Sequence, residues 1–307
     1  MKVLLLFPMA DGQTGSAIKY AFEQLGHEVE FVDAKIEPST SFFTAEEFKP
    51  DLVFCSRTYQ LTEEVKKIKK RFKDATICMW NVDTRKSIDE WHYLFSLIKL
   101  CDYYFVVSSR LIPEWKRINP NTFWLPQGLQ NEVYHKPKEI TKEDKKRYAC
   151  DVCWAGHLGG VHQFREPYLN AVSAMGINFK QWGCKANPHI YNENHNKMVA
   201  LSKINLALSA YPENEKTTSV RNYKILGAGG FCLELYREGI YEIFPPGKLQ
   251  CFTSPDDLKN KIVYWLNKEY EQERRQIAET GHKWVCENAT YTHRILQMCE
   301  YMKRSLC

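Results

Sequence analysis

Short apolar runs alternate with polar stretches of helical spacing along the first part of the chain. The apolar runs have the polar borders of buried strands, and they lie at 3–7, 27–34, 51–56, 75–80 and 103–108. Stretches of helical spacing lie between them, at 14–25, 60–72 and 87–99. Strands that alternate with helices predict a parallel, doubly wound α/β sheet. Ligands of such sheets bind beyond the carboxyl ends of the strands.

This pattern is interrupted between 126 and 148, where two prolines accompany a charged stretch without an apolar face. A second series then follows, with expected strands at 150–156, 177–183, 204–210, 231–235 and 249–253, and expected helices at 164–175, 255–268, 270–287 and 291–304. We therefore predict a Rossmann-like domain at 1–130, a linker at 131–148, a second Rossmann-like domain at 149–288 and a terminal helix at 289–307.

The composition is that of a globular protein. Of the 307 residues, 44% are hydrophobic and 26% are charged, and no apolar run approaches the ~20 residues of a membrane span. The apolar start of the chain continues as a strand and a helix without a cleavage pattern, so we expect the first strand of the fold and a cytoplasmic protein. The net charge of +5 permits anionic ligands without requiring nucleic acid.

The eleven cysteines are scattered and lie mostly in apolar runs, so we expect reduced thiols in the core. Cys150 and Cys153 form a C-x-x-C within a predicted strand, but no second pair follows at zinc spacing. We expect no metal site and no cofactor.

The segment 217–234, TTSVRNYKILGAGGFCLE, is the most informative part of the sequence. A helix that begins at Ser219 would direct free backbone N–H groups and its positive dipole end at a ligand. Arg221 adds a guanidinium that can bind a phosphate with two donors. The segment therefore predicts an anion site; a helix end with an exposed arginine is the alternative interpretation.

This segment resembles the donor-site helix of GT-B glycosyltransferases, and in particular the branch of CgeB-like proteins and related "glycosyl transferases group 1" domains. The family's R-N-F-E-A-x-A-x-G pattern corresponds to residues 221–229, RNYKILGAG, in which Arg221, Asn222 and Lys224 take its first, second and fourth places. The resemblance implies two Rossmann-like domains that face a cleft, with a C-terminal helix that crosses back to the first. It also implies that Arg221, Asn222 and Lys224 bind the donor. Lys224 replaces the family's glutamate, and a lysine cannot accept hydrogen bonds from ribose hydroxyls.

Two stretches in the first half correspond to loops that line the cleft in this family. Gly12, Thr14 and Gly15 lie between the first strand and helix, as a donor or acceptor loop or as a plain turn. Asp83 follows a buried strand in a W-x-x-D pattern, which implies a general base near the acceptor. A helix N-cap is the alternative role of Asp83.

Two further stretches in the second half resemble loops that face the nucleotide sugar. Gly156, His157 and Arg165 follow the first strand of the second domain, where the resemblance implies contacts to the donor. Trp182 and Lys185 follow the next strand, where they would stack on the base and contact a phosphate. A surface loop is the alternative for this last stretch.

Taken together, the sequence predicts a glycosyltransferase that moves a sugar from a nucleotide-diphosphate sugar to a hydroxyl acceptor. Cations and helix dipoles would stabilise the leaving diphosphate without a metal, and kinship with group 1 enzymes favours retention of configuration. The acceptor is a hydroxyl of a glycan, a protein or DNA. Two alternatives stay open: a non-catalytic nucleotide- or sugar-binding protein, and a DNA-base glycosyltransferase.

Overall fold

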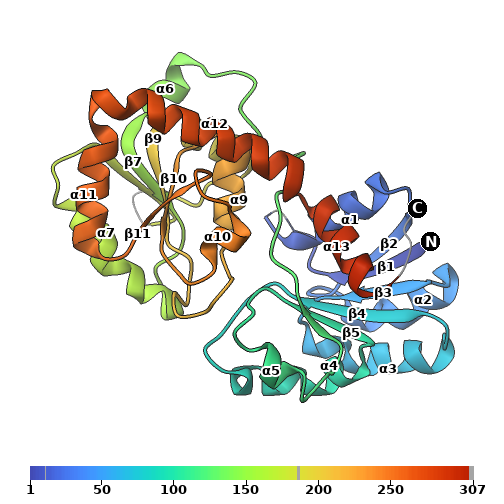
Figure 1. Ribbon diagram of the computed structural model, residues 1–307. Helices are drawn as coiled ribbons and strands as arrows, with labels where there is room; N and C mark the ends of the chain where they lie inside the picture. Colours follow the sequence, from blue (N-terminus) through green and yellow to red (C-terminus); the bar gives the residue numbers. More distant parts are fainter. Residues whose placement is uncertain (11, 185–186, 304–307) are drawn as a thin grey trace. The chain divides into compact units, whose positions relative to one another are not determined.

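The computed structural model describes residues 1–10, 12–184 and 187–303. The chain divides into two compact units (Figure 1). The first comprises Met1–Gln127, Asn214–Thr217 and the chain from Tyr291 onward; the second comprises Gly128–Glu213 and Thr218–Thr290.

The first unit contains a six-stranded sheet of parallel strands in the order β2-β1-β3-β4-β5-β6. Its strands are β1 Lys2–Phe7, β2 Glu28–Asp33, β3 Leu52–Cys55, β4 Thr76–Asn81, β5 Tyr103–Val106 and β6 Thr122–Trp124. Its helices are α1 Thr14–Gln24, α2 Ser41–Phe48, α3 Thr62–Arg71, α4 Phe95–Leu100, α5 Ile112–Trp115 and α13 Tyr291–Tyr301. The direction of winding changes between β1 and β3, which makes this the switch point of the sheet.

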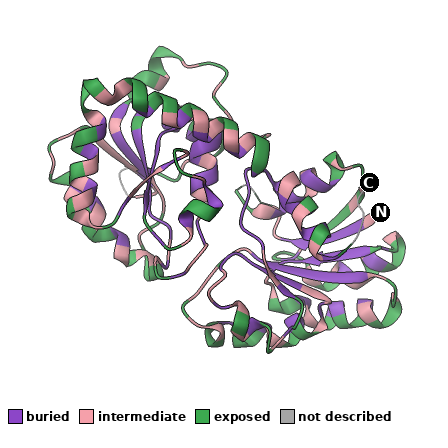
Figure 2. Ribbon diagram, in the orientation of Figure 1, coloured by how far each residue is buried: buried purple, intermediate pink, exposed green. Residues whose placement is uncertain are grey.

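Alternation along the strands builds a separate core on each face of this sheet. Val3 and Leu5 pack into one core with α1 and α13, whereas Leu4 and Leu6 pack into the other with α2, α3 and α4. Both faces are covered, which is why the central strands β1, β3 and β4 are mostly apolar and appear buried in Figure 2, whereas the edge strand β2 is largely exposed. Gly15 lets α1 approach β1, because a Cβ there would lie 2.4 Å from the carbonyl oxygen of Pro8.

The second unit contains a five-stranded parallel sheet in the order β11-β10-β9-β7-β8. Its strands are β7 Cys150–Ala155, β8 Phe179–Trp182, β9 Ser202–Ala207, β10 Cys232–Leu235 and β11 Gln250–Phe252. Its helices are α6 Lys142–Tyr148, α7 Glu166–Ser173, α8 Asn192–Ala200, α9 Val220–Gly227, α10 Ile240–Ile243, α11 Pro255–Leu266 and α12 Glu271–Asn288. The two doubly wound sheets predicted from the sequence are confirmed.

Helices α7 and α11 pack together over one face of this sheet, and α12 packs along α9 (Figure 1). Five short 3-10 helices complete the described elements: Pro38–Thr40, Tyr59–Leu61, Ile88–Leu94, Gly160–Arg165 and Lys268–Tyr270. No helix of the described residues is both long enough and apolar enough to cross a membrane.

The segment 131–148, which we expected to be a linker, lies in the second unit. Thr141 caps α6 by accepting a hydrogen bond from the backbone N–H of Asp144, and α6 packs against α8. A single residue, Tyr148, is buried on α6. The other residues of this short helix are charged, so no apolar pattern in the sequence indicates that it packs against α8.

Candidate functional site

The switch point of the second sheet lies between β7 and β9, which are neighbours in the sheet. Loops leave the carboxyl ends of these strands at Gly156 and Leu208. The second loop leads into α9 through Ser219, whose Oγ accepts a hydrogen bond of 3.2 Å from the backbone N–H of Arg221. The segment 217–234 therefore starts a helix at the place where doubly wound sheets bind their ligands.

Arg221 joins the two loops. Its Nε donates to the carbonyl oxygen of Ala155 at 2.7 Å, and its Nη1 donates to that of Leu208 at 3.3 Å. A Cβ on Gly156 would lie 2.6 Å from Nη2 of Arg221, so glycine is required there for this approach. Burial lowers the pKa of Arg221. The guanidinium is thus fixed by the protein, unlike the exposed arginine of the alternative interpretation.

Arg165 lies in the wall of the same switch point and is only 3% exposed. Its Nε donates to the carbonyl oxygen of Leu208 at 2.8 Å and its Nη1 to that of His157 at 2.7 Å. Burial, and next the positive charge of Arg221, lower its pKa to about 9. Arg165 therefore supports these two loops. Its predicted contact with the donor stays a hypothesis.

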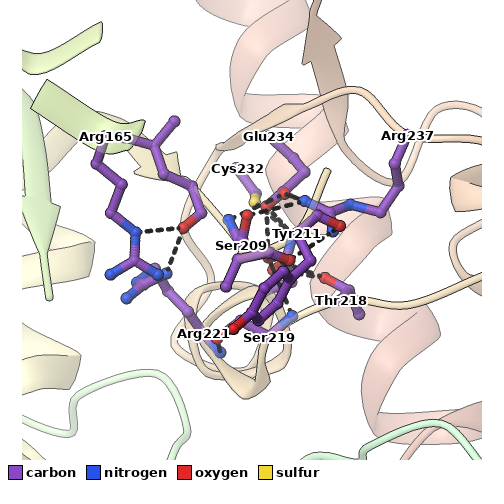
Figure 3. A network of polar contacts seen from close by, with 12 residues as sticks. Arg165, Ser209, Tyr211, Thr218, Ser219, Arg221, Cys232, Glu234 and Arg237 are labelled. Atoms are coloured by element: carbon purple, nitrogen blue, oxygen red, sulfur yellow. Dashed lines mark hydrogen bonds and ion pairs between the residues drawn. The ribbon is translucent and has the colours of Figure 1, made fainter. Parts of the chain in front are cut away.

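A fully buried ion pair lies behind α9. Nη2 of Arg237 contacts Oε1 of Glu234 at 3.0 Å, and both side chains are inaccessible to solvent. Oε2 of Glu234 accepts a 2.7 Å hydrogen bond from Nδ2 of Asn222, and Oδ1 of Asn222 accepts one from the hydroxyl of Thr218 at 2.8 Å. Asn222, which we predicted to bind the donor, is buried in this network; Figure 3 shows the part of it around Glu234, Arg237 and Thr218. Its contacts fix the start of α9.

A cavity of about 150 Å³ lies beside the first turns of α9. We call it the basic cavity; its lining includes Gly156, Tyr191, His195, Ser219, Arg221 and Lys224. None of the described residues that line it is acidic.

Two of these groups are strongly perturbed by burial. Burial, and next the charge of Arg221, lower the pKa of Lys224 to about 8, and its Nζ lies 4.3 Å from the ring centre of Tyr134. Burial, then Lys224 and Arg221, lower the pKa of His195 to about 3, so this imidazole is neutral at physiological pH. His195 is 5% exposed, and its Nδ1 has no hydrogen-bond partner among the described residues. Perturbed groups in a cavity are typical of functional sites.

Other residues predicted in this unit have different environments. Trp182 is only 3% exposed and packs against Tyr148 with ring centres 5.5 Å apart. Only a small part of its side chain therefore lines the basic cavity. His157 is exposed, with its ring 6.3 Å from that of His189. Lys185 lies outside the described residues.

In the first unit, Asp83 follows β4 and its side chain is 48% exposed. Its Oδ2 lies 2.5 Å from Nη2 of Arg57, which follows the neighbouring strand β3. The next helix is capped instead by Ser87, which accepts from the backbone N–H of Asp89. The structure thus excludes the N-cap role for Asp83 and leaves its catalytic role a hypothesis.

The β1–α1 loop contains the other predicted residues of this unit. Gly12 has a φ of 78°, which favours glycine, and is exposed. Thr14 is the first residue of α1, while Gly15 is buried against β1. Gly12 and Thr14 can therefore meet a ligand, whereas Gly15 serves packing.

Several residues of these sites were not predicted. His195 comes from α8, a helix with no recognisable motif, and its approach to Lys224 depends on the fold. Glu234 and Arg237 are three residues apart, a spacing that hints at a pair, but their burial has no sequence signal. Within the described part of the chain, no group of three or more His, Cys, Asp or Glu side chains is arranged to hold a metal ion.

The chain resembles known proteins in part of its sequence and in its fold. Residues 160–300 match the family described as glycosyl transferase-like. No curated protein matches the sequence.

Solved structures share the fold over nearly the whole chain. HepE of Anabaena, in complex with UDP and glucose, is 12% identical with a TM-score of 0.69, and 99% of each chain is covered. Sucrose-phosphate synthase of Thermosynechococcus elongatus is 9% identical with a TM-score of 0.69, covering 99% of this chain and 98% of that one. A glycosyltransferase of Rickettsia africae is 9% identical with a TM-score of 0.66, and 99% of each chain is covered.

The prediction of a glycosyltransferase with the GT-B fold is confirmed by the family match together with the shared fold. Membership of the CgeB-like branch stays a prediction.

Proposed function

We propose that this GT-B glycosyltransferase moves a sugar from a nucleotide-diphosphate sugar to a hydroxyl acceptor, and that the donor diphosphate binds in the basic cavity. One observation carries the proposal: Arg221, Lys224 and the N-terminus of α9 border the same cavity, and no acidic residue is among its described lining. Each of these groups attracts an anion. HepE was crystallised with UDP-glucose, so a uridine nucleotide is the first candidate.

In this mechanism the leaving diphosphate gains charge as the bond to the sugar breaks. Arg221 is already held by two carbonyl oxygens, so it needs no reorganisation when that charge develops. Lys224 contributes a second cation, and these side chains take the charge-neutralising role that a metal has in other transferases. We propose a retaining reaction by analogy with group 1 enzymes.

Asp83 is the proposed general base for the acceptor hydroxyl. It is exposed at the carboxyl end of β4, beside the switch point of the first sheet, and Arg57 orients its carboxylate. The proposal divides the work between the units: the second binds the donor, and the first binds the acceptor.

Thermal unfolding in the presence of a panel of nucleoside diphosphates and nucleotide sugars tests donor binding. A ligand at 100 times its Kd adds about 2.7 kcal/mol to the free energy of unfolding. Stabilisation by a uridine, guanosine or adenosine diphosphate, but not by the nucleoside, supports the diphosphate site. No stabilisation by any member of the panel contradicts it.

Lys224 favours a second candidate, a non-catalytic nucleotide-binding protein, because it replaces the glutamate that the family uses for ribose. Release of nucleoside diphosphate from the bound nucleotide sugar separates the two: turnover identifies the enzyme, and binding without turnover identifies the second candidate.

Product anomers resolved by proton NMR then report retention or inversion. Unchanged activity in EDTA is expected, and activity that requires an added divalent ion would contradict the metal-independent mechanism.

A further inference from the structure

The loop between β9 and α9 leaves the second unit for four residues. Asn214–Thr217 belong to the first unit, whereas Glu213 and Thr218 on either side belong to the second. We call Asn214–Thr217 the strap. It ends two residues before Ser219, the cap of the helix that carries Arg221.

The strap is held in the first unit by hydrogen bonds along its length. The carbonyl oxygen of Glu215 accepts from the hydroxyl of Ser108 at 3.2 Å, and that of Lys216 accepts from Nε1 of Trp124 at 2.8 Å. Lys216 has a φ of 45°, a conformation that costs a non-glycine residue energy and persists only where the surroundings impose it. These contacts make the strap a part of the first unit.

Asn214 makes the most specific of these contacts. It is fully buried. Its Nδ2 donates to Oγ1 of Thr84 at 2.8 Å and to the carbonyl oxygen of Arg85 at 3.0 Å, while its Oδ1 accepts from Nε of Arg110 at 2.8 Å. Arg110 in turn donates to the carbonyl oxygen of Lys86. Asn214 therefore fixes, directly and through Arg110, the three residues that follow Asp83.

We propose that Asn214 is a positioning residue for sugar transfer: it holds the loop 82–86, and with it Asp83, in the geometry that the reaction requires. This inference rests on the proposed function. The same strap continues covalently, through Thr218 and Ser219, into α9, the helix that carries Arg221. A displacement of about 1 Å at a reacting group can cost about 10²-fold in rate.

Asn214→Asp tests the proposal with little change in size. A carboxylate still accepts from Arg110, but it cannot donate to the carbonyl oxygen of Arg85 and repels it. We expect faster hydrogen exchange of the backbone amides of residues 82–86 in the free protein. We also expect a loss of kcat of about tenfold to a hundredfold with an unchanged Kd for the nucleoside diphosphate. Asn260→Asp, an exposed asparagine on α11, is the matched control.

A double variant separates positioning from a purely structural role. If Asn214 acts through Asp83, the loss of kcat in Asn214→Asp with Asp83→Asn equals that of Asp83→Asn alone. Additive losses overturn the proposal, as does unchanged exchange at 82–86 in folded Asn214→Asp. Thr84→Val removes the hydrogen bond between Asn214 and Thr84 from the loop side, and it replaces Asn214→Asp if that variant does not fold. Unchanged hydrogen exchange of residues 82–86 in folded Thr84→Val also overturns the proposal. The exchange measurement needs no substrate, so a wild-type protein without transferase activity refutes the proposed function separately.

Discussion

Arg165 and Arg221 donate to the same acceptor, the carbonyl oxygen of Leu208, at 2.8 and 3.3 Å. Two guanidinium groups are thereby held close together in a poorly solvated part of the switch point. Their repulsion contributes to the lowered pKa of Arg165. An anion bound beside Arg221 would offset this repulsion, which supports the proposed binding of a diphosphate in the basic cavity.

Arg221→Lys is expected to weaken nucleoside diphosphate binding by about tenfold to a hundredfold, because the lysine keeps the charge but loses the planar fork. One amine cannot replace both the Nε and the Nη1 contacts, so the free energy of unfolding should fall by about 1–3 kcal/mol. Titration calorimetry measures the first effect and urea denaturation the second. Arg275→Lys, at an exposed arginine of α12, is the control. Wild-type affinity in folded Arg221→Lys would refute the contact.

Glu234→Gln is expected to lower the free energy of unfolding by about 3–5 kcal/mol, because it leaves the buried guanidinium of Arg237 without its counter-charge. Urea denaturation measures this loss. Glu273→Gln, an exposed glutamate of α12, should change the value by less than about 0.5 kcal/mol. An equally small change for Glu234→Gln would show that the carbonyl oxygens around Arg237 are sufficient to stabilise it.

The sheets could be predicted because each central strand is an apolar run with polar borders. The same criterion missed β6, which contributes just Thr122–Trp124 at the sheet edge, and α8, whose first residues are all polar. It also predicted a linker where α6 forms, since a helix that buries a single tyrosine has no apolar period.

Residues of the candidate site could be predicted only where they belong to a recognisable local pattern in the sequence. The spacing of Arg221 and the following glycines indicated the anion site, and the structure places this segment at the switch point. His195 and Asn214 contribute through contacts with residues distant in the sequence, and no local pattern distinguishes them from other polar residues. Asn222 shows the converse: a residue inside a recognisable pattern supports the helix from its buried side.

Lys224 should make nucleoside diphosphate binding depend on pH near its pKa of about 8. The ammonium form attracts the anion, and it prevails below that pH, so affinity should fall as the pH rises through 8, by up to about tenfold per unit. His195 stays neutral over this range, because its pKa is about 3. Calorimetry of Lys224→Gln should show weaker binding without this pH dependence, whereas Lys203→Gln, at an exposed lysine, should keep it. Wild-type pH dependence in Lys224→Gln would assign the titration to another group.

Asp83→Asn is expected to lower kcat by about 10²-fold or more and to leave the Kd for nucleoside diphosphate unchanged, because the amide keeps the size of the side chain but cannot take a proton. Stability should change by less than about 1 kcal/mol, since Ser87 caps the following helix and the pair with Arg57 is exposed. Steady-state kinetics with saturating donor measures the effect, with Asp74→Asn as the exposed control. If folded Asp83→Asn turned over like the wild type, Asp83 would serve only its ion pair, and the proton would have to leave through another group or the departing phosphate.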